Sequence, residues 1–184
     1  MNQYEIIYAD PPWKYGSKGA RSGKFGELPY PSMTIKEMCQ LKVPAHDDCF
    51  LFMWATSPFM MDANKVADAW GFKYIRVDSV WCKTKGSGSP HGVCGPHGMT
   101  DAEYLLLFGK GNYMSLYNGN KKNQYTVVTE NYTGKHSQKP SIFRERIDEK
   151  VKNGLNRLEM FARTAPLGWH VWGNEVECDV MVES

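Results

Sequence analysis

A carboxylate, two prolines and a tryptophan stand together near the start of the chain, at Asp10-Pro11-Pro12-Trp13. Residues 4–8 before them are apolar and β-branched, which predicts a short buried strand that ends at the carboxylate. Each proline fixes φ and lacks an N–H, so the backbone that follows is stiff and its carbonyl oxygens are not consumed by a helix. Acceptor oxygens beside a flat ring suit a planar amine. The structural alternative is an ordinary strand-ending turn.

Two further stretches supply an aromatic ring and a cation. Tyr30, in Glu27-Leu28-Pro29-Tyr30, stands on a proline-stiffened loop and could stack on a base held outside its helix. Lys139 immediately precedes Pro140, the predicted start of a helix, where anions bind. The alternatives are a surface tyrosine and a loop lysine in water.

Polar side chains also follow the last two predicted strands. Arg163 comes after the strand predicted over 157–162, and Asn174 and Glu175 come after the one predicted over 169–172. Ligands of open α/β sheets bind outside the carboxyl ends of strands, where an arginine can bind a carboxylate or a ribose hydroxyl. Ordinary turn chemistry is the alternative at all three positions.

The hydrophobic pattern supplies the elements that must position these groups. Apolar runs predict strands over 4–8, 49–55, 73–82, 103–109, 157–162 and 169–172, with a β-like piece over 125–129. Helices are predicted to begin at three capped positions: after Thr34 with Glu37 as its capping-box partner, after Thr56 and Ser57, and at Pro140. The alternation of strands and helices predicts an α/β fold with parallel pairing.

Length, charge and cysteine content limit what kind of protein this is. The 184 residues fit one domain, 1–184, and a net charge of +2 is too small to indicate nucleic acid by itself. With neither a signal peptide nor an apolar membrane span in the sequence, five cysteines predict free thiols and a cytoplasmic location. A zinc site is the alternative use of four residues, but their spacing fits no standard finger and no metal is predicted. They are Cys82, His91, Cys94 and His97.

The tetrad and the stretches that follow it resemble the MT-A (seventy-kilodalton subunit) family of S-adenosylmethionine-dependent N6-adenine methyltransferases. The resemblance runs in family order from residue 4 to 175. Besides the tetrad it includes 27–30, 50–54, 70–72, 81–84, Glu103, 136–140, 161–163 and 172–175. It implies a Rossmann-like methyltransferase fold: a mostly parallel, twisted sheet with helices on both faces. The motif order is permuted (β-type), with the tetrad ahead of the cofactor strand.

The resemblance implies catalytic and substrate roles. The tetrad Asp10-Pro11-Pro12-Trp13 would be catalytic, with Asp10 and the Pro11 carbonyl accepting hydrogen bonds from the target amine. Trp13 and Tyr30 would sandwich or flank the adenine, and Glu103 would help to orient it. Trp54 and Trp81 would be pocket walls, or simply core.

The resemblance also implies where the methyl donor binds. Lys139 would meet the carboxylate of S-adenosylmethionine, and Arg163, Asn174 and Glu175 would meet its ribose and adenine. Asp10 belongs to this cofactor set as well as to the catalytic set. The product would be S-adenosylhomocysteine.

The implied function is methyl transfer to the 6-amino group of adenine in DNA, in a small member of bacterial or phage type. The alternatives are the same chemistry on RNA adenosine, a catalytically inactive nucleic-acid-binding partner subunit, and N4-cytosine methylation. We expect no membrane association, no separate target-recognition domain, and a homodimer or heterodimer as an open alternative to a monomer. The segment 84–100 departs from the arginine- and aromatic-rich loop of the family.

Overall fold

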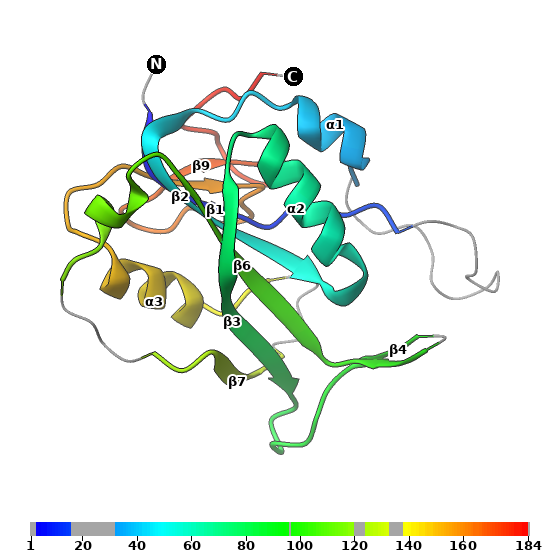
Figure 1. Cartoon of the computed structure of the whole chain (residues 1–184). Helices are drawn as coiled ribbons and strands as arrows, with labels where there is room; N and C mark the ends of the chain where they lie inside the picture. The colour runs from blue at the N-terminus through cyan, green and yellow to red at the C-terminus, as the bar shows by residue number, and fades with distance from the viewer. Residues whose placement is uncertain (1–2, 16–31, 96, 120–123, 133–137, 184) are drawn as a thin grey trace.

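The structure is a computed structural model that describes residues 3–15, 32–95, 97–119, 124–132 and 138–183. Its described residues contain a seven-stranded sheet in the order β7-β3-β6-β2-β1-β8-β9 (Figure 1). The strands of this sheet are β1 (Tyr4–Ala9), β2 (Ala45–Thr56), β3 (Lys73–Thr84), β6 (Ala102–Lys110), β7 (Val127–Asn131), β8 (Arg157–Met160) and β9 (His170–Trp172). A separate two-stranded ribbon joins β4 (Val93–Gly95) to β5 (Gly98–Thr100).

The sheet is parallel except at β6. β1 pairs in parallel with β2 and β8, β8 with β9, and β3 with β7. β6 lies between β2 and β3 and is antiparallel to both. The predicted strand–helix–strand unit from β2 to β3 therefore runs parallel, but β6 separates its strands. The chain reaches β6 through the β4–β5 ribbon without a crossover helix, and a neighbouring strand reached in this way runs antiparallel.

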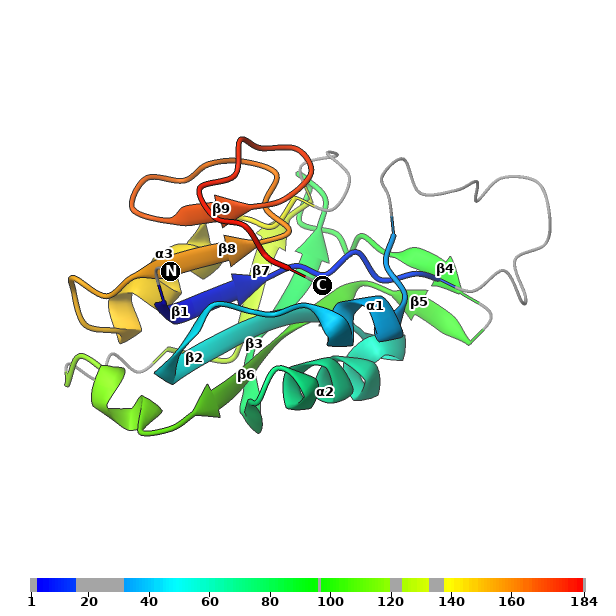
Figure 2. The same ribbon diagram turned by 90° about the horizontal axis from the view of Figure 1, so that it is seen from above.

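Helices cover both faces of the sheet, as predicted (Figure 2). α1 (Ile35–Gln40) and α2 (Met60–Ala69) bury apolar side chains against one face, and α3 (Ile142–Lys150) does so against the other. Successive residues of β1 point to opposite faces. Ile7 therefore joins the α1 and α2 core, while Ile6 and Tyr8 join the α3 core.

Two of the predicted helix starts show what local signals determine. Thr34 caps α1, and its hydroxyl and the Glu37 side chain form the predicted capping box. At the second start, the chain first forms a 3₁₀ turn over Ser57–Phe59, and Thr56 makes no capping hydrogen bond. The Thr56 hydroxyl is instead hydrogen-bonded to Tyr15 at 2.8 Å, 41 residues away in the chain. None of the helices in the described segments is long and apolar enough to cross a membrane.

Candidate active site

Asp10 stands at the carboxyl end of β1, between the ends of β2 and β8. Its N–H donates to the Met160 carbonyl of β8 (3.4 Å), which holds the turn against the neighbouring strand. The Pro11 carbonyl accepts a hydrogen bond from the Trp13 N–H at 2.9 Å. A carbonyl oxygen has two lone pairs, so Pro11 can still accept a second hydrogen bond from a ligand.

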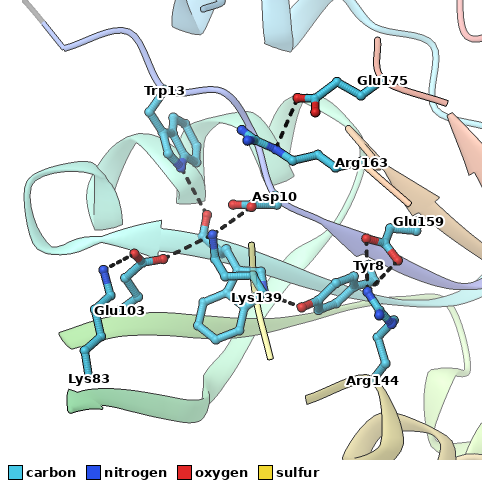
Figure 3. A network of polar contacts seen from close by, with 11 residues as sticks. Tyr8, Asp10, Trp13, Lys83, Glu103, Lys139, Arg144, Glu159, Arg163 and Glu175 are labelled. Carbon is cyan, nitrogen blue, oxygen red and sulfur yellow. Dashed lines mark hydrogen bonds and ion pairs between the residues drawn. The ribbon is translucent and has the colours of Figure 1, made fainter. Parts of the chain in front are cut away.

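A chain of four charged side chains begins at Asp10 (Figure 3). The Lys139 Nζ donates to the Asp10 carboxylate at 2.7 Å and lies 3.2 Å from the Glu103 carboxylate. Glu103 is in turn 2.5 Å from the Lys83 Nζ. The Lys139 side chain is only 4% exposed. The four charges alternate in sign and sum to zero, which is the arrangement that buried ions require.

Burial and these partners set the pKa values of Asp10, Glu103 and Lys139. Burial raises the pKa of Asp10, and Lys139 opposes this rise only in part. Burial also pushes the pKa of Glu103 upward, but Lys139 and Lys83 outweigh that effect and leave the pKa lowered. Burial disfavours the Lys139 ammonium, whereas Asp10 and Glu103 together raise its pKa well above the ordinary value. Lys139 is therefore protonated at neutral pH.

Aromatic rings form the walls beside this chain. The Lys139 Nζ lies 5.4 Å from the centroid of the Trp54 ring, a cation–π distance. The Trp13 ring stacks on Phe59 at 5.2 Å, and its Nε1 donates to the Trp54 carbonyl at 3.1 Å. Trp54 Nε1 donates to the Tyr8 hydroxyl at 2.6 Å. These bonds fix the rings in position.

Two clefts open at the Asp10–Lys139 pair, and both are lined by these two residues. The first cleft has mostly aromatic and hydroxyl walls. Its other lining residues are Pro11, Trp13, Tyr15, Trp54, Ala55, Thr56 and Glu103. The second cleft has mostly charged and polar walls. Its other lining residues are Tyr8, Gln138, Arg144, Glu159, Phe161, Arg163 and Thr164.

A buried ion pair in the second cleft was not predicted from the sequence. Arg144 of α3 donates to the Glu159 carboxylate of β8 at 3.1 Å. Burial raises the pKa of Glu159 to about 7 despite this arginine. A carboxylate between the buried apolar residues Leu158 and Met160 was the available signal. Its partner could not be read from the sequence, because Arg144 lies 15 residues away on a helix.

Phe161 directs the chain past this cleft. It follows β8 with φ of +61° and is the single described non-glycine residue with a positive φ. Such a conformation is costly for an L-residue and is held only when the surrounding packing requires it. Close packing does so here, since a Cβ atom on Gly173 would lie 2.2 Å from the Ala162 carbonyl oxygen. The turn brings Arg163 to the second cleft.

Some of the predicted site residues line the two clefts, and others do not. Asp10, Pro11, Trp13, Trp54, Glu103, Lys139 and Arg163 line one or both clefts. Glu175 reaches the rim through a 3.6 Å ion pair with Arg163, while Asn174 is exposed and lines neither cleft. Trp81 is buried beneath the site, where its Nε1 donates to the Glu130 carbonyl at 3.0 Å. Tyr30 lies outside the described residues.

The residues considered for zinc do not form a cluster in the described part of the chain. There, no three histidine, cysteine or acidic side chains come together as metal ligands. His91 instead stacks on Tyr132, with ring centroids 4.6 Å apart.

Comparisons with known proteins give a consistent result. The family model described as MT-A70 matches residues 4–175. The chain is 33% identical to the Type II methyltransferase M.MunI of Mycoplasma sp, over 95% of this chain and 78% of that protein. It is 30% identical to a probable N(6)-adenosine-methyltransferase MT-A70-like protein of Oryza sativa subsp. japonica, and 29% identical to the human N(6)-adenosine-methyltransferase catalytic subunit METTL3. It spans 23% and 29% of those two proteins, respectively.

Proposed function

Because the chain belongs to the MT-A70 family, we infer that it is an adenine N6-methyltransferase, and we propose that it acts on DNA. One observation carries the assignment of the site: two chemically different clefts meet at Asp10 and Lys139. A transferase needs two ligands to meet at one point, and at Asp10 and Lys139 two clefts share residues. We propose that the target base occupies the first cleft and the methyl donor the second.

The first cleft suits adenine. Trp13 and Trp54 offer apolar ring surface, while the Asp10 carboxylate and the Pro11 carbonyl offer acceptors. An exocyclic amine donates two hydrogen bonds, so it can be held by these two acceptors at once. Glu103 lines the same cleft and can accept a further hydrogen bond from the base. A base inside a duplex cannot reach such a pocket and has to be flipped out.

The second cleft suits S-adenosylmethionine, which supplies a methyl group bound to a positively charged sulfur. Arg163 and Arg144 are cations for its carboxylate or ribose hydroxyls, and the Glu159 carboxylate can accept from its amino group or hydroxyls. Gln138 and Thr164 add neutral hydrogen-bonding groups. Lys139 holds Asp10 and Glu103, and its contact with the carboxylate of the donor stays a prediction. The contacts of Asn174 and Glu175 with the ribose and adenine of the donor stay predictions as well.

We propose that Asp10 activates the amine by holding it. The lone pair of the 6-amino nitrogen is delocalised into the adenine ring, which makes the nitrogen a poor nucleophile. Accepting its two hydrogens at Asp10 and Pro11 favours a tetrahedral nitrogen and localises the lone pair for attack. Lys139 stabilises the ionised form of Asp10 against burial and holds the carboxylate in place. Because Lys139 is itself protonated, it cannot serve as the general base, and we assign the leaving proton to water.

The share of each relative's length that this chain matches favours DNA over RNA as the substrate. The chain accounts for 78% of M.MunI, a Type II methyltransferase, but for less than a third of the rice and human N(6)-adenosine-methyltransferases. RNA adenosine is therefore the second candidate substrate. The part of the chain that resembles METTL3 leaves most of that protein unmatched, so no partner is transferred from it. We keep a homodimer or heterodimer, and a cytoplasmic location in a bacterial cell or phage-infected host, as predictions.

Labelled methyl transfer tests this function directly. The full chain, S-adenosylmethionine and either duplex DNA, single-stranded DNA or RNA are incubated in parallel, and nucleosides are analysed by mass spectrometry. We expect N6-methyladenine in DNA and not in RNA. Label in RNA alone would change the substrate, and N4-methylcytosine would change the base. Donor binding by calorimetry without any transfer would indicate a missing partner, and no donor binding would favour the inactive subunit.

A further inference from the structure

Tyr15 is an aromatic residue of the first cleft that the sequence motifs do not single out. It comes two residues after the tetrad, and it lines the cleft together with Asp10, Trp13 and Thr56. Its hydroxyl is 2.8 Å from the Thr56 Oγ1, at the carboxyl end of β2. Its ring packs edge-on against Phe59, with centroids 4.8 Å apart and planes at 84°. Two contacts from another part of the chain therefore hold this ring at the cleft.

The exposure of the ring separates Tyr15 from the other aromatic walls. Tyr15 is 53% exposed, whereas Trp13 is 6% and Trp54 is 1% exposed. One face of Trp13 is covered by Phe59, which stacks on it with planes at 13°. Of the aromatic side chains that line the first cleft in the described structure, Tyr15 is thus the most exposed. A half-exposed ring beside acceptor groups is the arrangement used to stack nucleic-acid bases.

We propose that Tyr15 is a substrate-binding residue whose ring stacks on the face of the target adenine, with the Thr56 hydroxyl fixing the ring beforehand. The inference rests on the proposed function. It explains why Thr56 does not cap the following helical turn, because its hydroxyl is committed to Tyr15. It also gives each aromatic ring of the cleft a place: Trp13 and Trp54 line the inner part, and Tyr15 closes the outer part.

Three variants separate stacking from packing. Tyr15→Leu keeps an apolar side chain against Phe59 but removes the ring. Tyr15→Phe keeps the ring and loses only the bond to Thr56. Tyr74→Leu is the matched control, because Tyr74 is 50% exposed and packs edge-on against Phe108 at the other end of the sheet. The methylated site is first mapped by sequencing DNA treated with the wild-type enzyme.

Steady-state kinetics then give KM for a duplex that carries the mapped site. We expect Tyr15→Leu to raise this KM by about tenfold, the size of one lost base stack, and Tyr15→Phe by about threefold or less. Donor affinity by calorimetry and the Tm stay at the wild-type values in both variants. Tyr74→Leu leaves KM unchanged.

Fluorescence gives a readout that packing alone would not change. 2-Aminopurine at the target position becomes bright when it is flipped out and is quenched when an aromatic ring stacks on it. We expect the Tyr15→Leu complex to be brighter than the wild-type and Tyr15→Phe complexes. Unchanged KM and emission in Tyr15→Leu, an equal defect in Tyr15→Phe, or a parallel loss of donor binding and Tm would each overturn the proposal. If the wild-type enzyme methylated no substrate, the proposed function itself would fail, which is a different result from normal methylation by Tyr15→Leu.

Discussion

The first cleft is lined by aromatic rings and a neutralised chain of charges, whereas the second is lined by an ion pair whose acid is only about half ionised at neutral pH. In the first, two lysines balance Asp10 and Glu103. In the second, burial outweighs Arg144 and raises the pKa of Glu159 to about 7. The difference follows from the number of cations beside each carboxylate. Two lysines lower the pKa of Glu103 despite its burial, whereas one close cation leaves the pKa raised at Glu159 and at Asp10. Glu103 in the first cleft therefore stays ionised at neutral pH, whereas Glu159 in the second cleft changes its charge there.

Removing the cation that both clefts share should have the largest effect. Lys139→Met would leave Asp10 and Glu103 as buried carboxylates with one fewer partner. We expect the free energy of unfolding to fall by about 3–5 kcal/mol, and methyl transfer to be lost. Urea unfolding at pH 7 measures the first, and labelled methyl transfer the second.

The matched control carries the same substitution at an exposed pair. Lys73 lies 2.6 Å from Asp68, but both side chains are largely exposed. Lys73→Met should change the free energy of unfolding by less than about 1 kcal/mol. Equal losses of unfolding free energy in the two variants would show that burial does not determine how much the ion pairs of Lys139 stabilise the fold.

Asp10→Asn tests whether the shared carboxylate belongs to chemistry or to donor binding. The amide keeps the shape but loses one strong acceptor for the target amine. We expect the rate of transfer to fall by about 100- to 1,000-fold, comparable to removing a group that contacts the transition state. Donor affinity by calorimetry should remain largely intact. A parallel loss of donor affinity would make Asp10 a cofactor residue of the second cleft instead.

Glu159→Gln tests the carboxyl group of the second cleft, whose charge changes near neutral pH. Because the folded-state pKa of Glu159 is raised to about 7 from an ordinary value near 4.5, the folded protein binds the extra proton between these pH values. Wild-type stability should therefore fall as the pH rises from about 5 to 8, by up to about 3 kcal/mol from this group. The variant lacks this titration.

Urea unfolding of wild type and Glu159→Gln across that pH range isolates the contribution, because the other titrating groups are common to both proteins. Identical pH profiles would mean that Arg144 keeps Glu159 ionised in the folded state. Calorimetry on the same variant should show weaker donor binding with an unchanged KM for DNA, which assigns Glu159 to the second cleft alone.

Glu175→Gln should have the smallest effect. Its ion pair with Arg163 is 3.6 Å long, and the Glu175 side chain is 53% exposed. We expect a stability change below about 1 kcal/mol and only a small change in donor affinity. Thermal unfolding and calorimetry measure both. A loss of donor binding as large as that of Glu159→Gln would place Glu175 in direct contact with the donor.

Local sequence signals were sufficient for most elements and for the stiff turn at Asp10. Two consecutive prolines after an apolar run predict a stiff turn at Asp10, because their φ restriction acts on adjacent residues only. The Thr34–Glu37 capping box is likewise confirmed, since its partners are three residues apart. The α/β class, helices on both faces and the MT-A family were predicted from such signals and from the order of the motifs.

Partners that are distant in the chain were decided only by the tertiary structure. Lys139 lies 129 residues from Asp10, and the order of the strands, not any local pattern, brings its ammonium to that carboxylate. The same holds for Thr56, which the sequence predicts as a helix cap and the structure pairs with Tyr15. A hydroxyl or ammonium bonds to whichever acceptor the packing presents. The sequence determined which groups this protein carries at its strand ends, and the sheet determined which of them meet.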